Sequence, residues 1–300
     1  MREMVRYVKR IKKTRLWTRN DRFKVLIFWG RFLSTRRALF GFILLFAIIF
    51  VALAAPFITW FPPLKTMVGK VFAPPNFTHL FGSDDLGRDI YTNVVYGART
   101  SLMVGLISVT ISVMIGVLIG ALSGYYGGKL GDLLMMMAEM FLVIPTFLLA
   151  LIITAIFGRD VPIIILAIAI ASWPGAARLM RAEFLSIKER PFIEAARTMG
   201  LSNTRIIFGE ILPNAISALI PYSTLQVGTA ILIEAGLSFL GVGDPNVPSW
   251  GSMLNNAQRF LRTSWWMAFF PGIALTITVL SLNLIGEALY DYLNPRLREP

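Results

Sequence analysis

Few residues of this chain are of a type that could carry out covalent catalysis or bind a metal. The sequence has no cysteine and a single histidine, His79. A thiolate nucleophile is therefore excluded, and a Ser-His-Asp triad or a histidine-based metal site would have to be built around His79. We interpret His79 as a solvated loop residue. The sequence thus predicts no enzyme and no metal site.

Two glycine-lysine pairs could belong to a phosphate-binding loop, and neither fits its pattern. The pair at 128–129 is followed by Leu130, and Ser123 stands where the first glycine of the loop should be. The pair at 69–70 is followed by Val71. A phosphate-binding loop needs Ser or Thr after the lysine to hold Mg²⁺. We expect no ATP site in this chain, so any ATPase must be a partner.

One acidic residue, Glu139, lies inside an apolar run. An acid within a membrane span is costly and is usually paired or functional. Counted from Asp132, Glu139 is only about 10 Å into the run. We expect Glu139 to pair with Arg178 or Arg181, which share a helix face, near the inner gate of the bundle. A proton relay is the alternative role.

Composition predicts an all-α polytopic membrane protein. The 300 residues are 56% hydrophobic and 15% charged. About 20 apolar residues in a helix cross the hydrocarbon core. Six runs meet this requirement, although the fourth is short: Ala38–Leu64, Ser101–Ser123, Leu133–Phe157, Val161–Ala177, Ile211–Ile233 and Thr263–Gly286. Small residues recur within them, and we attribute these to close helix packing, with room for a substrate path as the alternative.

The distribution of charge predicts the topology. The net charge is +12, and residues 1–37 hold thirteen Lys or Arg against two acids. The positive-inside rule and anionic lipid account for such a tail better than nucleic-acid binding does. With six spans, both termini are then cytoplasmic, and Trp60–Thr100 and Glu234–Arg262 lie outside. We divide the chain into a basic tail, 1–37, and a membrane domain, 38–300.

A polar, glycine-broken stretch interrupts the apolar pattern at Glu194–Pro213. The pattern predicts one short helix over Phe192–Met199, with Ala195, Ala196 and Met199 on one face. Gly200 is suited to end that helix, and Ser202 can cap a second one that continues to Leu212. A helix–glycine–helix arrangement predicts a knob that fits a partner's groove. An idle cytoplasmic connection is the alternative.

The same stretch resembles the EAA loop of bacterial ABC importer permeases. Glu210 is only a mild departure: the general pattern has an apolar residue there, but the oligopeptide and dipeptide subfamily, which the chain also resembles, is polar at this position. The residues that carry the resemblance are Glu194, Ala195, Ala196, Gly200, Leu212 and Pro213. Further stretches resemble the C-type subunit of oligopeptide and dipeptide permeases: 79–102 with Asp84, Gly87, Arg88 and Asp89, then 234–243, 248–251 with Trp250, Trp265-Trp266, 270–272, and the tail through Asn294-Pro295-Arg296. The resemblance covers about residues 38–298.

This resemblance implies the transmembrane domain of a type I ABC importer, with six helices and a cytoplasmic coupling loop at about 185–213. It implies a second homologous permease, two ATPase subunits that hold ATP and Mg, and an extracytoplasmic solute-binding protein. The bacterial cytoplasmic membrane is the implied location, and di- or oligopeptides are the implied substrates.

Two kinds of alternative stay open. The same architecture serves importers of oligosaccharides or nickel. A stand-alone channel or secondary transporter would predict inverted repeats or ionisable residues at mid-span, which are not evident here. Trp250, Trp265 and Trp266 are read as an interfacial aromatic belt, with contact to an external binding protein as the alternative.

Overall fold

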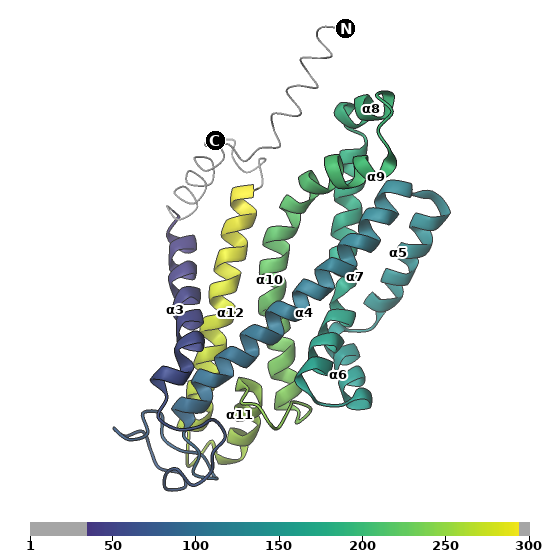
Figure 1. Cartoon of the computed structure of the whole chain (residues 1–300). Helices are drawn as coiled ribbons and strands as arrows, with labels where there is room; N and C mark the ends of the chain where they lie inside the picture. Colours follow the sequence, from purple (N-terminus) through teal and green to yellow (C-terminus); the bar gives the residue numbers. More distant parts are fainter. Residues whose placement is uncertain (1–34, 294–300) are drawn as a thin grey trace.

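The computed structural model describes residues 35–293, which form a bundle of long helices (Figure 1). Most of the basic tail at 1–37, and Asn294-Pro295-Arg296, lie outside the described residues. The helices are α3 (Arg36–Ile58), α4 (Ile90–Tyr126), α5 (Gly128–Val143), α6 (Thr146–Phe157), α7 (Val161–Lys188), α8 (Pro191–Thr198), α9 (Asn203–Ile206), α10 (Leu212–Phe239), α11 (Trp250–Ala257) and α12 (Trp266–Leu293). A π-helical turn at Ile207–Ile211 joins α9 to α10.

Five helices are long and apolar enough to cross a membrane, and α5 with α6 makes a sixth candidate. The all-helical, multi-span prediction is thereby confirmed. The third expected span is nevertheless broken, since α5 and α6 are bent by 83°. Ile144 is extended and Pro145 precedes α6. Proline lacks an N–H and disfavours a helical residue before it, which explains the break at this point.

The helix α4 crosses the bundle obliquely in front of a row formed by α3, α12, α10 and α7 (Figure 1). Its closest approach is to α7. An added Cβ at Gly116 would lie 2.5 Å from the Ala176 Cβ, and one at Gly124 would lie 2.6 Å from the Phe184 Cβ. Small residues on one helix face allow such an approach. These glycines therefore serve helix packing, as the sequence predicts.

The two ends of the bundle carry different structures. We call residues 190–211 the knob; α8 and α9 lie within it at one end (Figure 1). We call residues 59–89 together with 241–265 the cap; it includes α11 and lies at the other end.

The helix that contains the fifth expected span extends beyond Glu234, where that apolar run was expected to end. The helix α10 continues to Phe239, and Glu234 is buried within it. Its carboxyl group accepts hydrogen bonds from the hydroxyls of Ser101, at 3.1 Å, and Ser238, at 2.8 Å. A buried acid is tolerated where hydrogen bonds satisfy it, so the helix does not end at the charge.

Candidate functional site

The first helix of the knob ends at Gly200, as the sequence predicts. Arg190 is extended before α8, and Pro191 takes the first helical position, where its missing N–H is harmless. Gly200 has φ +75°. The Gly200 N–H donates to the Arg197 carbonyl at 2.9 Å, and the Leu201 N–H donates to the Ala196 carbonyl at 3.2 Å. These two bonds form a Schellman motif, which fixes the direction in which the chain leaves the helix.

The second helix of the knob merges with a membrane span. Ser202 occupies the capping position before α9, but its side chain makes no capping hydrogen bond. The chain then passes through the π-helical turn, where Leu212 N–H donates to the Ile207 carbonyl. Leu212 and Pro213 begin α10. No loop intervenes between the second helix of the knob and α10, so the two are continuous.

The first helix of the knob buries only part of its surface. Ile193 and Ala196 are buried, whereas Ala195 and Met199 are exposed. The buried pair packs in a cluster with residues of α4, α7, α9, the π-helical turn and α10, among them Phe184, Ile187, Ile206, Ile207 and Ile211. Of the three residues expected on one helix face, Ala196 therefore lies at its buried edge and Ala195 and Met199 lie outside, while the large Ile193 side chain contributes most of the buried apolar surface.

Tyr125, near the end of α4, anchors the knob and was not singled out from the sequence. Its hydroxyl donates to the Asn203 side chain at 2.7 Å, and its carbonyl accepts from the Lys188 ammonium at 2.5 Å. The Lys188 ammonium and the Arg197 guanidinium lie 5.7 and 6.0 Å from the Tyr125 ring centroid. Tyr125 and Asn203 are 78 residues apart. No local pattern could indicate this contact.

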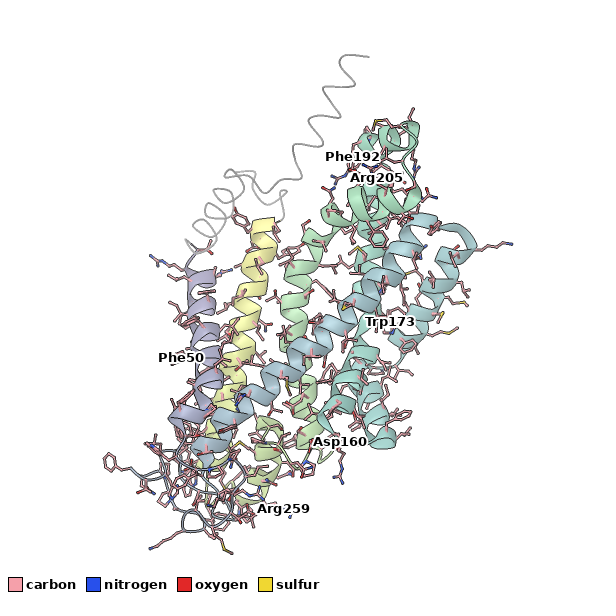
Figure 2. The ribbon with its side chains drawn as sticks, viewed as in Figure 1. Phe50, Asp160, Trp173, Phe192, Arg205 and Arg259 are labelled. Carbon is pink, nitrogen blue, oxygen red and sulfur yellow. The ribbon has the colours of Figure 1, made fainter. Side chains whose placement is uncertain are left out.

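The outer side of the knob exposes a mixture of apolar and charged side chains. Phe192 is 36% exposed and Met199 is 43% exposed. Glu194 and Arg197 are exposed beside them. Phe192 and Arg205 both lie at this end of the molecule in Figure 2. Apolar anchors inside a polar rim are typical of protein–protein contacts, so this surface is suited to binding a partner.

The expected inner-gate charges do not come together as expected. The Arg181 guanidinium lies 3.1 Å from the Asp132 carboxylate. Among the described residues no ion pair joins Glu139 to Arg178 or Arg181, and both Glu139 and Arg178 are exposed on this chain. The Asp132 side chain is 74% exposed. Pairing Arg181 with this carboxylate therefore costs little desolvation.

The opposite end of the bundle collects the other expected residues. Asp84 accepts backbone N–H bonds from Leu86 and Arg88, at 2.9 and 2.8 Å. Gly87 has φ +67°, and a Cβ there would lie 2.6 Å from the Gly69 carbonyl oxygen. Burial raises the pKa of Asp84, and the two backbone bonds oppose that shift. These residues form a tight loop within the cap.

His79 is not a solvated residue. It is buried, its Nδ1 donates to the Asp89 carboxylate at 2.9 Å, and its ring stacks on Phe61 at 5.3 Å between centroids. Asp89 also caps α4 by accepting from the Thr92 N–H at 2.8 Å. Because Asp89 satisfies the imidazole, burial costs little.

Two of the three tryptophans do not form an aromatic belt. Trp250 and Trp266 are 1% and 7% exposed, whereas Trp265 is 54% exposed. The Trp250 indole N–H donates to the Val94 carbonyl at 2.9 Å, and the Trp266 N–H donates to the Ser83 carbonyl at 3.2 Å. A partner for the N–H allows a tryptophan to be fully buried.

Residues 35–293 contain no group of three or more potential metal ligands. The candidate site therefore consists of the knob, with its anchors on α4 and α7 and its direct continuation into α10.

Comparison with known proteins agrees with this geometry. Residues 116–299 match the family described as binding-protein-dependent transport system inner membrane component. Residues 26–75 match the N-terminal TM domain of oligopeptide transport permease C. The chain belongs to this inner membrane component family. The resemblance to oligopeptide and dipeptide permeases is thereby confirmed.

Relatives with named functions match almost the whole chain. A dipeptide transport system permease protein of Alkalihalophilus pseudofirmus is 40% identical over 88% of each chain. A dipeptide transport system permease protein of Escherichia coli is 40% identical over 91% of this chain and 93% of its own length. A di/tripeptide transport system permease protein of Pseudomonas aeruginosa is 37% identical over 90% and 92%.

Solved structures support the fold. The inward-facing MetNI methionine ABC transporter matches with a TM-score of 0.56 at 19% identity, over 67% of this chain and 96% of that chain. An amino acid ABC transporter matches with a TM-score of 0.51 at 18% identity, over 66% and 92%. The chain has the permease fold of ABC importers.

Proposed function

We propose that this chain is one of two permease subunits of an ATP-driven importer of di- or oligopeptides, and that the knob receives force from a partner ATPase. The observation that carries the proposal is the exposed outer side of a knob that is continuous with α10. The names of the relatives support the peptide substrate.

The proposal assigns the chemistry of ATP hydrolysis to other chains. Two ATPase subunits bind ATP and Mg, a second homologous permease completes the path, and a solute-binding protein delivers the peptide outside. ATP binding draws the ATPases together and moves the knob. The close-packed bundle then changes between two arrangements, because packed helices are bistable rather than continuously deformable.

The proposal also fixes the orientation in the bacterial inner membrane. The knob and both termini face the cytoplasm, with residues 1–37 as a basic tail and the coupling loop at about 185–213 inside the domain 38–300. The excess of Lys and Arg in residues 1–37 supports this orientation. The cap then faces the solute-binding protein.

A substitution at Gly200 tests the role of the knob. A Cβ at Gly200 meets nothing within 4 Å, so Gly200→Val acts through the backbone alone. A β-branched residue at positive φ costs roughly 1–2 kcal/mol, and escape from that strain redirects the second helix. We expect the complex to assemble while ATP hydrolysis loses its dependence on loaded binding protein and peptide uptake falls.

The measurement is ATPase activity with and without loaded binding protein, beside uptake of a labelled dipeptide into vesicles. Gly200→Asn is the matched control, since Asn tolerates positive φ. Normal stimulation and uptake in Gly200→Val would show that the knob is only a connection. Uptake of an oligosaccharide or nickel in place of peptide would overturn the substrate but not the coupling.

A further inference from the structure

An apolar groove of about 770 Å³ lies between α3 and α4, with α10 and α12 behind it. Its walls are formed by Leu45 and Leu53 of α3, Leu102 and Leu106 of α4, Val227 of α10 and Leu282 of α12. Leu53 is 72% exposed and Leu106 is 60% exposed. The groove is therefore open to the surroundings of the bundle, and its rim is apolar.

A single cation stands at one end of this groove. Arg99 is exposed, and its guanidinium lies 5.9 Å from the Tyr96 ring centroid. Within residues 35–293 no carboxylate lies within 4.0 Å of Arg99. Trp60 and Tyr91, whose rings are 6.2 Å apart, lie towards the same end. Aromatic side chains of this kind gather at the depth of lipid headgroups.

Two of the three hydroxyls on the walls of the groove are already hydrogen-bonded, and Ser223 carries the third. The Thr110 hydroxyl donates to the Leu106 carbonyl at 2.7 Å, and the Thr224 hydroxyl donates to the Ile220 carbonyl at 2.9 Å. Both are satisfied within their own helices. A hydrocarbon chain can therefore lie along the groove without leaving these polar groups unpaired.

The groove follows one face of α4. The lining residues of α4 run from Arg99 to Met114, about 22 Å of helix. One acyl chain spans about half of the ~30 Å hydrocarbon core, so the groove is long enough to hold it.

We propose that this groove binds one phospholipid, with the phosphate on Arg99 and an acyl chain between α3 and α4. A guanidinium binds phosphate through two parallel hydrogen bonds. The apolar walls of the groove contact the acyl chain of the same lipid. The bound lipid fills the groove between α3 and α4. This proposal does not depend on the transported substrate or on the ATPase partners.

The test measures lipid retained by the purified complex containing this chain. The complex is reconstituted in phosphatidylglycerol and phosphatidylethanolamine, extracted in mild detergent and analysed by native mass spectrometry. We expect Arg99→Gln to reduce the retained phospholipid about tenfold or more, as the loss of a charge-assisted hydrogen bond predicts. Arg159→Gln is the matched control, because Arg159 is exposed towards the same end and does not line the groove.

A second variant tests the groove rather than the charge. Thr110→Phe fills the groove while Arg99 remains, and it should also reduce the amount of phospholipid retained. Thermal unfolding and gel filtration check that the complex is intact. Equal retention in wild type, Arg99→Gln and Thr110→Phe would overturn the proposal. A photoreactive residue at Met103 supplies an independent measurement: labelling of lipid supports the site, and labelling of a partner polypeptide instead overturns it.

Discussion

The cap and the knob differ in how deeply their hydrogen-bonded polar groups are buried. In the cap, His79 bonds to the buried Asp89 at 2.9 Å, and the Trp266 indole, at the start of α12, bonds to the carbonyl of the buried Ser83 at 3.2 Å. In the knob, the apolar cluster around Ile193 and Ala196 is buried, whereas Asn203, the hydrogen-bond partner of Tyr125, is exposed. Gly200 at the tip of the knob meets no neighbour at all on its open side.

We expect this difference to make the cap the more rigid of the two ends. Buried hydrogen bonds have narrow geometry and are costly to break, so the cap is expected to keep one arrangement. Apolar contacts are less directional, and the Tyr125 hydroxyl bonds to an exposed side chain, Asn203, so we expect the knob to tolerate a tilt better than the cap does. Such a tilt is what the proposed function requires of the knob.

The strongest test of the comparison is Asp89→Ala in the cap. The change removes the side chain that accepts a hydrogen bond from the first turn of α4, and it leaves the buried His79 imidazole without its acceptor. We expect a loss of about 2–5 kcal/mol in the free energy of unfolding, from both effects together. Chemical denaturation in detergent measures it. Asp85→Ala is the control at the neighbouring position, and an equal loss in both variants would contradict the role of the Asp89 contacts.

The corresponding change in the knob is Ile193→Ala. It opens a void in the cluster with Phe184 and Ile206, and we expect a local cost of about 2 kcal/mol. Amide hydrogen exchange should accelerate in α8 but not in α11, because the two ends are separate. Phe192→Ala, at an exposed neighbour, should leave exchange unchanged. Faster exchange at both ends would show that the knob and the cap form one cooperative unit.

The pH dependence of the cap gives a smaller effect. Burial raises the pKa of Asp84, so the folded cap binds this proton more tightly than the unfolded chain. The contribution of Asp84 to stability is therefore largest below the unfolded pKa of about 3.9 and declines as pH rises through the higher folded value. Protease resistance of the cap, followed between about pH 4 and 7, should decline less steeply in Asp84→Asn. Identical slopes would show that Asp84 does not titrate differently on folding.

The smallest expected effect concerns Asp132 and Arg181. Their ion pair is 3.1 Å long, but Asp132 is 74% exposed. A double-mutant cycle should give a coupling energy of about 0–1 kcal/mol. The same cycle with Glu139 and Arg181 should give no coupling, and a larger value there than for Asp132 would restore the pair expected from the sequence.

The sequence by itself determined the membrane bundle and the form of the knob. Every backbone polar group in lipid needs an internal partner, so long apolar runs such as 101–123 can only become helices. Gly200 and Pro213 act on their immediate neighbours, and their effects on the chain are local. For this reason the glycine turn and the start of α10 follow from residue types alone.

Only the tertiary structure decided which polar and aromatic residues are buried. His79 and Trp250 look like exposed residues until Asp89 and the Val94 carbonyl are brought to them. The contact of Tyr125 with Asn203 joins residues 78 positions apart. Glu234 is tolerated inside a helix because Ser101 reaches it from α4. A polar group can be buried only where the fold places a hydrogen-bond partner beside it, and the local residue spacing does not show whether a distant residue will be that partner.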